Sequence, residues 1–341
     1  MLDGVREMLA DEEAWVVGGA VRDELLGRPL VDLDVACREP ERAAKAYTDR
    51  AGGAVFSLSE RHGAWRVAHR DGRTVDFTPL PDEGIEADLA TRDFTVNAIA
   101  RPLAGGAQVD PFGGLDDLGA KRLRAVSPTV FEDDPLRVLR AVRFEQELDF
   151  RMDDETERLV RKHASLVTRP AGERILDELS RLGPASFRRL DELGLLAPLG
   201  GSVDRLDRLE PRSNRLLLVA VFGECLERLP VSRELARYAR ALLHAKPPTG
   251  LDARSVHRFR RATEPWALDA VVFLGESEEL SRAVEIARAA EPDEPLVRGD
   301  ELGLPPGPAI GRILERIEEE RAAGTISTRE EALDLARRES R

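Results

Sequence analysis

A pair of aspartates near the start of the sequence has the spacing that phosphate chemistry on a divalent cation requires. Asp32 and Asp34 alternate with the apolar residues Val31, Leu33 and Val35. Because side chains alternate between the two faces of a β-strand, both carboxylates would lie on one face. Two carboxylates held side by side on a rigid strand suit phosphoryl or nucleotidyl transfer assisted by a divalent metal.

Two glycines precede these acids at a predicted turn. Gly18 and Gly19 follow the apolar run Trp15–Val17 and precede Ala20–Leu26, whose apolar residues have helical spacing. A strand-to-helix turn of this kind exposes backbone amides and a helix N-terminus, which bind phosphate. A double glycine alone is more often a turn without a binding role, and alternating acids more often lie on the solvent-exposed face of a strand. The two features together, in this order, favour a catalytic site.

Polar residues on two later segments could complete such a site. Thr74–Thr78 alternates around Asp76, a candidate third carboxylate that binds metal or helps to deprotonate an attacking hydroxyl. The alternative is a solvent-facing strand acid. Further on, Arg92 suits contact with phosphate or ribose through its forked guanidinium, and Asn97 suits the ribose hydroxyls. By itself, the segment around these two residues is typical of a charged helix entry.

A helix with one row of arginines is predicted after residue 134. Asp134 before Pro135 is a typical helix start, with an acid at the N-cap and proline at the first helical position. Arg137, Arg140 and Arg143 then recur at i, i+3 and i+6, opposite an apolar face. Such a row can read a nucleotide base and hold a triphosphate.

The pattern of elements changes near residue 115. Before it, short alternating runs mix with helices, which predicts an α+β head; after it, nearly every segment has helical spacing. The predicted strands are Trp15–Gly18, Asp32–Ala36, Ala54–Ser57, Ala64–Ala68, Thr74–Thr78 and Ala98–Arg101, with helices at 19–26 and 40–51. The predicted later helices are 135–148, 153–167, 172–182, 184–194, 213–228, 231–243, 252–262, 265–274, 277–290, 306–323 and 327–339. We expect a head at 1–120, a helical neck at 121–200, and a helical body and tail at 201–341.

Charge and composition narrow the class of protein. A net charge of −13 argues against indiscriminate coating of nucleic acid, but it leaves room for a local basic groove. The first residues lack the apolar core of a signal peptide, and no uncharged apolar run reaches membrane-spanning length, so we expect a cytoplasmic protein without membrane contact. Cys37 and Cys225 fit no metal or redox spacing and are expected to be reduced.

The order of these motifs resembles a known family. The pattern G-G-x-V-R-D followed by D-x-D is similar to the active-site signature of the polymerase-β-like nucleotidyltransferases, in the version found in class II tRNA nucleotidyltransferases and bacterial poly(A) polymerases. The resemblance implies that Gly18, Gly19, Arg22 and Asp23 bind the nucleotide. It also implies that the strand acids are catalytic: Asp32 and Asp34 hold two Mg²⁺ ions, and Asp76 assists.

Two further motifs support this resemblance. Thr91–Ala98 resembles R-R-D-F-T-x-N-A, with threonine in place of the first arginine, which implies that Arg92, Asp93 and Asn97 contact the sugar and phosphates of the nucleotide. The segment 132–137 resembles E-D-x-x-R, with Asp133 in place of the usual glutamate. The resemblance implies that the following pair reads the base edges of CTP and ATP, and that the arginine row binds the nucleotide; these residues are Asp134, Arg137, Arg140 and Arg143.

Weaker matches follow, and the resemblance runs from about residue 14 to the end. Gly172–Leu179 is similar to a helix, E-R-I-x-x-E-L, that lies behind the base pocket in this family. We expect its Glu and Arg residues to form an intrahelical charge pair with a structural role. Pro306–Gly311 resembles a tail segment that could contact tRNA. The implied fold is a polymerase-β-like head with a small mixed β-sheet, followed by an all-α neck, body and tail.

The resemblance implies template-independent addition of CMP and AMP, from CTP and ATP, to the 3′ end of tRNA, with no role for DNA. The segment Pro79–Ala90 is shorter than the flexible loop of complete CCA-adding members, which is typical of members that add only two cytidines.

A-adding activity, poly(A) polymerase and a catalytically silent RNA-binding protein remain alternatives. The acidic end, 313–341, disfavours poly(A) polymerase, and the three aspartates disfavour a silent protein. P-loop chemistry is excluded because its glycine-lysine motif is absent. No histidine is followed by aspartate, so no metal-dependent phosphohydrolase domain is expected.

Overall fold

The computed structural model describes residues 1–59, 63–209, 211 and 213–340. It divides into two compact units. Unit 1 comprises Met1–Leu182 and Arg188–Leu199, and unit 2 comprises Gly183–Phe187 and the chain from Gly200 onwards. The finer division into head, neck, body and tail stays a prediction.

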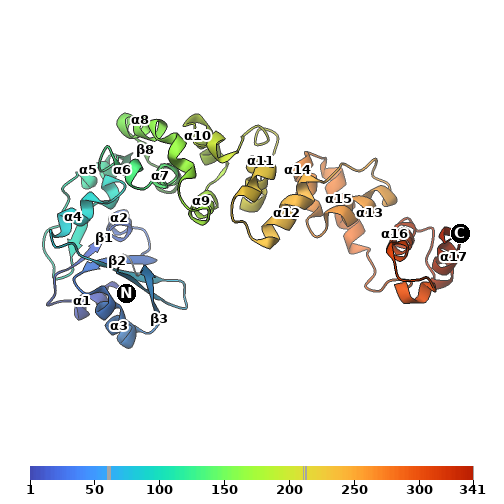
Figure 1. The fold of residues 1–341 in the computed structure, drawn as a ribbon, viewed down its shortest axis with the longest axis horizontal. Helices are drawn as coiled ribbons and strands as arrows, with labels where there is room; N and C mark the ends of the chain where they lie inside the picture. Colours follow the sequence, from blue (N-terminus) through green and yellow to red (C-terminus); the bar gives the residue numbers. More distant parts are fainter. Residues whose placement is uncertain (60–62, 210, 212, 341) are drawn as a thin grey trace. The chain divides into compact units, whose positions relative to one another are not determined.

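The first part of unit 1 is built on a six-stranded mixed sheet (Figure 1). Its strand order is β3-β4-β5-β2-β1-β6, and β2 and β5 form its parallel pair. The six predicted strands are confirmed, with ends that move by two residues or fewer. Their bounds are β1 Ala14–Val17, β2 Asp32–Cys37, β3 Ala54–Ser59, β4 Ala64–Ala68, β5 Thr74–Pro79 and β6 Ala100–Pro102.

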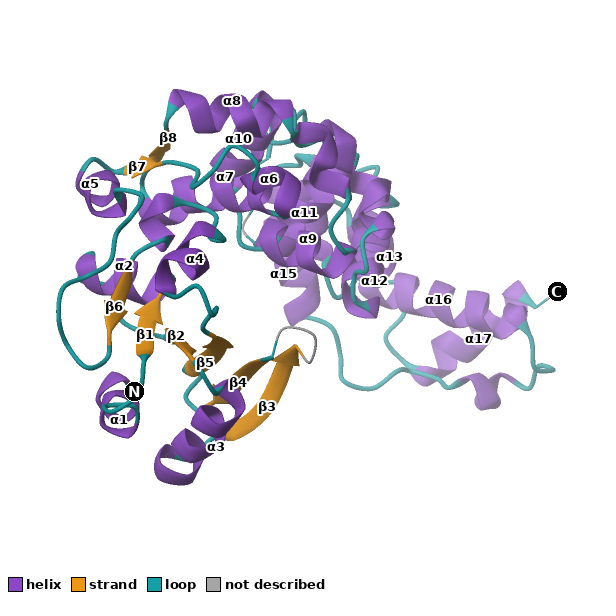
Figure 2. Ribbon diagram, turned by 60° about the vertical axis from the view of Figure 1, so that its left-hand side comes forward, coloured by secondary structure: helices purple, strands orange, loops and turns teal. Residues whose placement is uncertain are grey.

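Helices cover both faces of this sheet. Figures 1 and 2 show α1 (Leu2–Met8) and α3 (Pro40–Ala51) on one side and α2 (Gly19–Leu25) on the other. On the α3 side, the apolar residues of the alternating strands form the core: Leu33, Val35, Val75 and Phe77 are all buried. The Tyr47 ring of α3 packs on Phe77, with centroids 6.0 Å apart. The acids between these apolar residues therefore lie on the opposite face, the face that α2 covers.

Helices dominate the rest of unit 1. They are α4 Ile85–Ala90, α5 Gly114–Gly119, α6 Val130–Asp133, α7 Arg137–Leu148, α8 Asp154–Lys162, α9 Gly172–Leu179 and α10 Pro184–Glu192, the last of which crosses the boundary between the units. A short parallel pair, β7 (Arg122–Leu123) and β8 (Arg151–Met152), joins the loops before α6 and α8. The short elements α1, α4, α5, α6, β7 and β8 were not predicted, because two to seven residues are too few to show a period.

Unit 2 is helical in the residues that the structure describes. Its main helices are α11 Asn214–Phe222, α12 Arg233–Leu243, α13 Ala253–Thr263, α14 Ala267–Leu274, α15 Glu278–Ala289, α16 Pro308–Ala322 and α17 Arg329–Glu339, which confirms the predicted positions. Five of them begin at a residue whose side chain accepts from the backbone N–H three residues on, namely Ser213, Ser232, Asp252, Ser277 and Thr328. Across the described residues, none of the helices combines the length and apolar content needed to cross a membrane.

Candidate active site

The glycine turn lies where the sequence predicts it. β1 ends at Val17, and α2 begins at Gly19. Gly18 has φ of 69°, and a Cβ atom there would lie 3.1 Å from Asp34 Oδ2 and 3.4 Å from Arg92 Nη1. Glycine is needed both for the left-handed backbone and for the close approach of these two side chains. The turn therefore lies directly against the acids of β2.

The three predicted acids share one face of the sheet. Asp34 on β2 is the register partner of Asp76 on β5, and Asp32 lies two residues earlier on β2. Burial, together with the charges of Asp76 and Asp32 and against the opposing charge of Arg92, raises the pKa of Asp34 to about 6. Asp32 accepts a hydrogen bond of 2.7 Å from Thr74 Oγ1. This face concentrates negative charge that a cation would neutralise.

The donor set fits a divalent cation whose coordination a substrate completes. Across the described residues, no group of three or more Asp, Glu, His or Cys side chains is arranged to hold a metal alone. Asp32 and Asp34 supply two hard oxygen donors, and Mg²⁺ is commonly bound by one or two carboxylates together with substrate phosphates. The like charges around Asp34 are a second sign of fit, because a bound cation would relieve their repulsion.

Asp76 differs from the other two acids in its partner. Arg66, its register partner on β4, donates from Nε to Oδ1 and from Nη2 to Oδ2, both at 2.7 Å. Both carboxylate oxygens of Asp76 are therefore engaged by one guanidinium. No signal in the sequence indicated this role for Arg66, because the pairing depends on which strands become neighbours.

Arg92 lies between the glycine turn and α4. Its Nη2 and Nε donate to Asp88 Oδ2 at 2.6 Å and 3.1 Å. Asp88 is buried at 8% exposure and belongs to α4, in the segment that the sequence predicts to be a short loop. One carboxylate thus orients the guanidinium that reaches toward Asp34.

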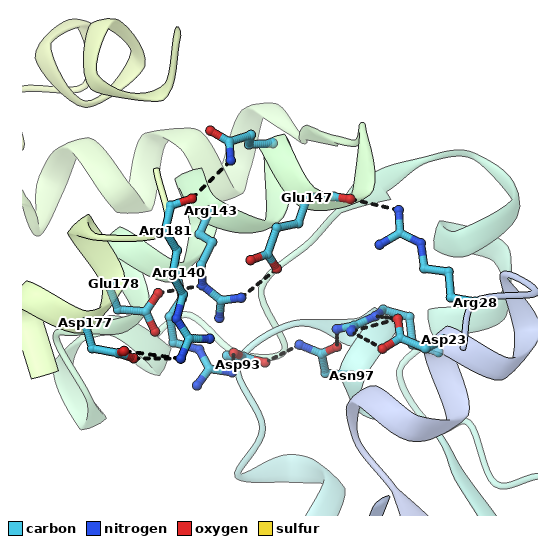
Figure 3. A network of polar contacts seen from close by, with 12 residues as sticks. Asp23, Arg28, Asp93, Asn97, Arg140, Arg143, Glu147, Asp177, Glu178 and Arg181 are labelled. Carbon is cyan, nitrogen blue, oxygen red and sulfur yellow. Dashed lines mark hydrogen bonds and ion pairs between the residues drawn. The ribbon is translucent and has the colours of Figure 1, made fainter. Parts of the chain in front are cut away.

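A chain of polar contacts links α2 to α7 (Figure 3). Arg22 bonds to Asp23 at 2.9 Å, and its Nη1 donates to Asn97 Oδ1 at 2.6 Å. Asn97 Nδ2 donates to Asp93 Oδ1 at 2.9 Å, and Arg140 Nη2 lies 2.8 Å from Asp93 Oδ2. Burial alone would raise the pKa of Asp93, but the charge of Arg140 and the hydrogen bonds from Asn97 and the Phe94 N–H lower it below its usual range. Asp93 is therefore a buried carboxylate that stays ionised.

Phe144 is a site residue that the sequence reasoning missed. Three guanidinium groups lie over its ring, with Cζ-to-centroid distances of 5.2 Å for Arg22, 5.4 Å for Arg140 and 4.4 Å for Arg143. Arg143 is also held by two acids, Glu178 and Glu147, each at 2.6 Å. An aromatic face attracts cations, so one buried ring orients three arginines. The position of Phe144 directly after the arginine row was the signal in the sequence that could have indicated this role.

The predicted base-reading pair lies on a neighbouring wall. Asp134 accepts from the Leu136 N–H at 3.1 Å and from Arg174 Nη2 at 2.7 Å. Arg137 Nη2 donates to the Thr91 carbonyl at 2.6 Å. Two predictions were wrong here. The helix begins at Arg137 rather than at residue 135, because the turn before it closes through a hydrogen bond between residues three apart, from the Arg137 N–H to the Asp134 carbonyl. Arg174 and Glu178 form no intrahelical pair: each binds a partner near or on α7 instead.

These side chains line one cavity of about 590 Å³. Every predicted site residue except Asp76 contributes to its wall. Asp88, Thr91 and Phe144 line it as well. The volume suits a bound nucleotide, and the wall carries both the acids and the arginine row.

Comparisons with known proteins agree with this geometry. A family model described as the poly(A) polymerase head domain matches residues 14–124, and a model described as the probable RNA and SrmB-binding site of polymerase A matches residues 149–200. An A-adding tRNA nucleotidyltransferase of Deinococcus radiodurans is 32% identical over 95% of both chains. The chain belongs to the tRNA nucleotidyltransferase family. The resemblance inferred from the motifs is therefore confirmed, and the protein is an enzyme of the nucleotidyltransferase class.

Other members of the family are also similar. A CC-adding tRNA nucleotidyltransferase of Thermus thermophilus is 30% identical over 94% of this chain and 92% of its own. A CC-adding relative from Geobacter sulfurreducens is 45% identical over 171 residues, which are 50% of this chain and 40% of that protein. These relatives favour neither a poly(A) polymerase nor a silent RNA-binding protein.

Solved structures establish the fold. A CCA-adding enzyme in complex with ATP has a TM-score of 0.81 at 23% identity and covers 100% of this chain and 95% of its own. The Thermotoga maritima CCA-adding enzyme complexed with tRNA has a TM-score of 0.73 at 23% identity, over 99% and 94% of the two chains. The predicted α+β class, with a polymerase-β-like head followed by helices, is confirmed.

Proposed function

We propose that this enzyme transfers CMP from CTP, and AMP from ATP, to the 3′ end of tRNA. The observation that carries the proposal is the single cavity that gathers the paired acids of β2, the glycine turn and the arginine row of α7. Relatives aligned over almost the whole chain are named for addition of A or CC to tRNA, and similar solved structures hold ATP, CTP or tRNA.

Asp32 and Asp34 would hold Mg²⁺, as their donor atoms and crowded charges allow. When bound there, Mg²⁺ supplies the positive charge that activates the 3′-hydroxyl of the RNA and stabilises the leaving pyrophosphate. The hydroxyl releases its proton to solvent and its oxygen bonds to the α-phosphorus while the bond from that phosphorus to pyrophosphate breaks, so no covalent enzyme intermediate is needed. Asp76 would assist from beside Asp34 as a negative charge near the cation site, with Arg66 as its own partner.

The nucleotide would lie between the glycine turn and α7. Arg92, held by Asp88 beside the turn, suits the triphosphate. The linked side chains of Arg22, Asn97 and Asp93 suit the sugar and the adjoining phosphates. The Oδ1 and Nδ2 atoms of Asn97 already form hydrogen bonds. The ribose hydroxyls would therefore contact a preorganised set of side chains rather than a free amide.

Base choice would come from Asp134 and Arg137. Cytosine and adenine each present an amino donor next to a ring-nitrogen acceptor, which match a carboxylate acceptor and a guanidinium donor. Uracil and guanine reverse this order and would leave buried groups unpaired, at a cost of roughly 1–3 kcal/mol per group. Both side chains keep capacity for the base, because a carboxylate accepts about four hydrogen bonds and a guanidinium donates five.

The deciding experiment incubates the enzyme with tRNA ending at the discriminator base, with CTP and ATP together or singly, and sizes the products at single-nucleotide resolution. We expect products three nucleotides longer with both nucleotides present. UTP and GTP alone serve as controls and should give no extension. Absence of extension with any nucleotide, from a folded protein with Mg²⁺, would overturn the proposal.

Addition of CC alone is a second candidate, because the segment Pro79–Ala90 is folded. Three of its apolar side chains, Leu80, Ile85 and Leu89, are buried in the core, and Asp88 is bonded to Arg92. A segment held by buried contacts opens less readily than a free loop to re-form the pocket around adenine. In the same assay, a product that stops two nucleotides on supports this candidate. Extension only of tRNA already ending in CC would indicate an A-adding enzyme.

A further inference from the structure

Three side chains stand in one row across neighbouring strands. Asp34 on β2 pairs in register with Asp76 on β5, and Asp76 pairs in register with Arg66 on β4. Residues directly opposite in a sheet point to the same face, so the row runs acid, acid, arginine on the α2 side. This is the face on which the candidate cation site lies.

The two acids of this row have different surroundings. Both oxygens of Asp76 accept from Arg66, at 2.7 Å each, and the Asp76 side chain is 14% exposed. Within the part of the chain that the structure describes, the Asp34 carboxylate has no hydrogen-bond donor. Asp34 and Asp32 line the cavity, whereas Asp76 does not. The guanidinium thus bonds to both oxygens of Asp76 and to neither of the acids that line the cavity.

We propose that Arg66 is a positioning residue that withholds Asp76 from the divalent cation. The proposal rests on the function proposed above. A forked, two-bond ion pair is among the stronger polar contacts in proteins, so a cation would have to compete with Arg66 for the oxygens of Asp76. The protein then supplies two carboxylate ligands, Asp32 and Asp34.

This arrangement has a chemical consequence for substrate binding. Mg²⁺ requires near-octahedral coordination, and each position that the protein fills is lost to the substrate. With Asp76 withheld, more positions remain for oxygens of the triphosphate and of the RNA 3′ end. Arg66 also offsets the charge of one of three adjacent carboxylates, so the row is balanced before any ligand arrives.

The test measures Mn²⁺ binding to the full-length enzyme without nucleotide or RNA, by the electron paramagnetic resonance signal of free Mn²⁺. The decisive variant is R66Q/D76N, which removes one positive and one negative charge and keeps the net charge and the approximate size of the pair. We expect it to bind Mn²⁺ within about twofold of the wild type. If Asp76 were a ligand, its loss would weaken binding by about 10–100-fold, and that result would overturn the proposal.

Two single variants test release of Asp76. R66K keeps the charge but cannot form the forked pair, and R66Q removes both. Freeing carboxylate oxygens beside Asp34 should make Mn²⁺ bind several-fold more tightly to each variant. If the affinity for Mn²⁺ rose in R66Q but not in R66K, the effect would come from charge alone. That result would contradict the proposal that the forked pair withholds Asp76.

A purely structural role for Arg66 would lower the melting temperature without tightening Mn²⁺ binding, which would also contradict the proposal. None of these measurements depends on turnover. A wild-type enzyme that adds nucleotides while R66Q/D76N binds Mn²⁺ poorly would refute only the role of Arg66. A wild-type enzyme that adds none would refute the proposed function instead.

Discussion

The guanidinium of Arg174 lies 2.7 Å from the carboxylate of Asp134 and joins α9 to the segment before α7. Leu136 donates its N–H to the same carboxylate at 3.1 Å. The acid proposed to read the base is therefore held from two directions before a nucleotide arrives. Preorganised groups discriminate better than mobile ones, because they cannot rearrange to suit the wrong base.

Replacing Arg174 with alanine should lower kcat/KM for CTP by about 10–100-fold, which corresponds to roughly 1.4–2.8 kcal/mol. It should also reduce the preference for CTP over UTP, because Asp134 loses its orientation. The matched control is Arg181→Ala. Arg174 and Arg181 are 51% and 52% exposed and each pairs with one aspartate, but the partner of Arg181 is Asp177, outside the cavity. Equal losses in both variants would contradict the assignment.

Replacing Asp34 with alanine should abolish nucleotide addition, with a loss of about 10³-fold or more, because the variant loses one of its two proposed cation ligands. Binding of tRNA should stay nearly intact, since the phosphate contacts that we expect from the helices would not involve this acid. Single-turnover incorporation and a filter-binding assay measure the two effects. Asp71→Ala, an exposed acid of the same sheet region, is the control and should be as active as the wild type. An active Asp34→Ala enzyme would refute the site.

Much of the head could be predicted from the sequence because its information is local. The alternation around Asp32 and Asp34 indicated both the strand and the shared face, and the double glycine indicated the turn. The same holds for the arginine row, whose members reach one cavity through helical spacing alone. Spacing within one element needs no knowledge of its neighbours.

The contacts that tune the site were not predictable in this way. Arg66 meets Asp76 because β4 lies beside β5, and Arg174 meets Asp134 across forty residues of chain. Each pair depends on the packing of whole elements, which periodicity does not report. The same limit explains Phe144. The sequence shows the arginine row directly before it, but not that Arg22 approaches its ring from α2.

The contact between α13 and α16 in unit 2 should weaken in acid. Hydrogen bonds from Arg254 and Thr325, with the charges of Arg254 and Arg316, lower the pKa of Glu320 to about 2. A carboxyl whose pKa is lowered by folding stabilises the fold above its unfolded pKa, near 4.3, and this contribution is lost as the pH falls toward the folded value. The measurement is the free energy of unfolding of the wild type and of Glu320→Gln between pH 7 and pH 2.5. The gap should be constant above about pH 5 and shrink below it. A gap that does not change with pH would contradict the assignment.

The last prediction concerns the ring under the three arginines. Phe144→Leu keeps an apolar side chain in a position that is 4% exposed, but it removes the aromatic face from Arg22, Arg140 and Arg143. Each cation–π contact is worth about 0.5–2 kcal/mol, so the arginines should lose order and the KM for CTP should rise by about tenfold or more.

The matched control for this change is Phe150→Leu. Phe150 is 3% exposed in the same unit and does not line the cavity. Both variants should lose a similar amount of stability, about 1–2 kcal/mol, because both leave a comparable void. Thermal unfolding and the KM for CTP, measured on the same preparations, separate the two effects. If Phe144→Leu and Phe150→Leu raise the KM equally, the ring contributes to packing alone and does not orient the arginine row.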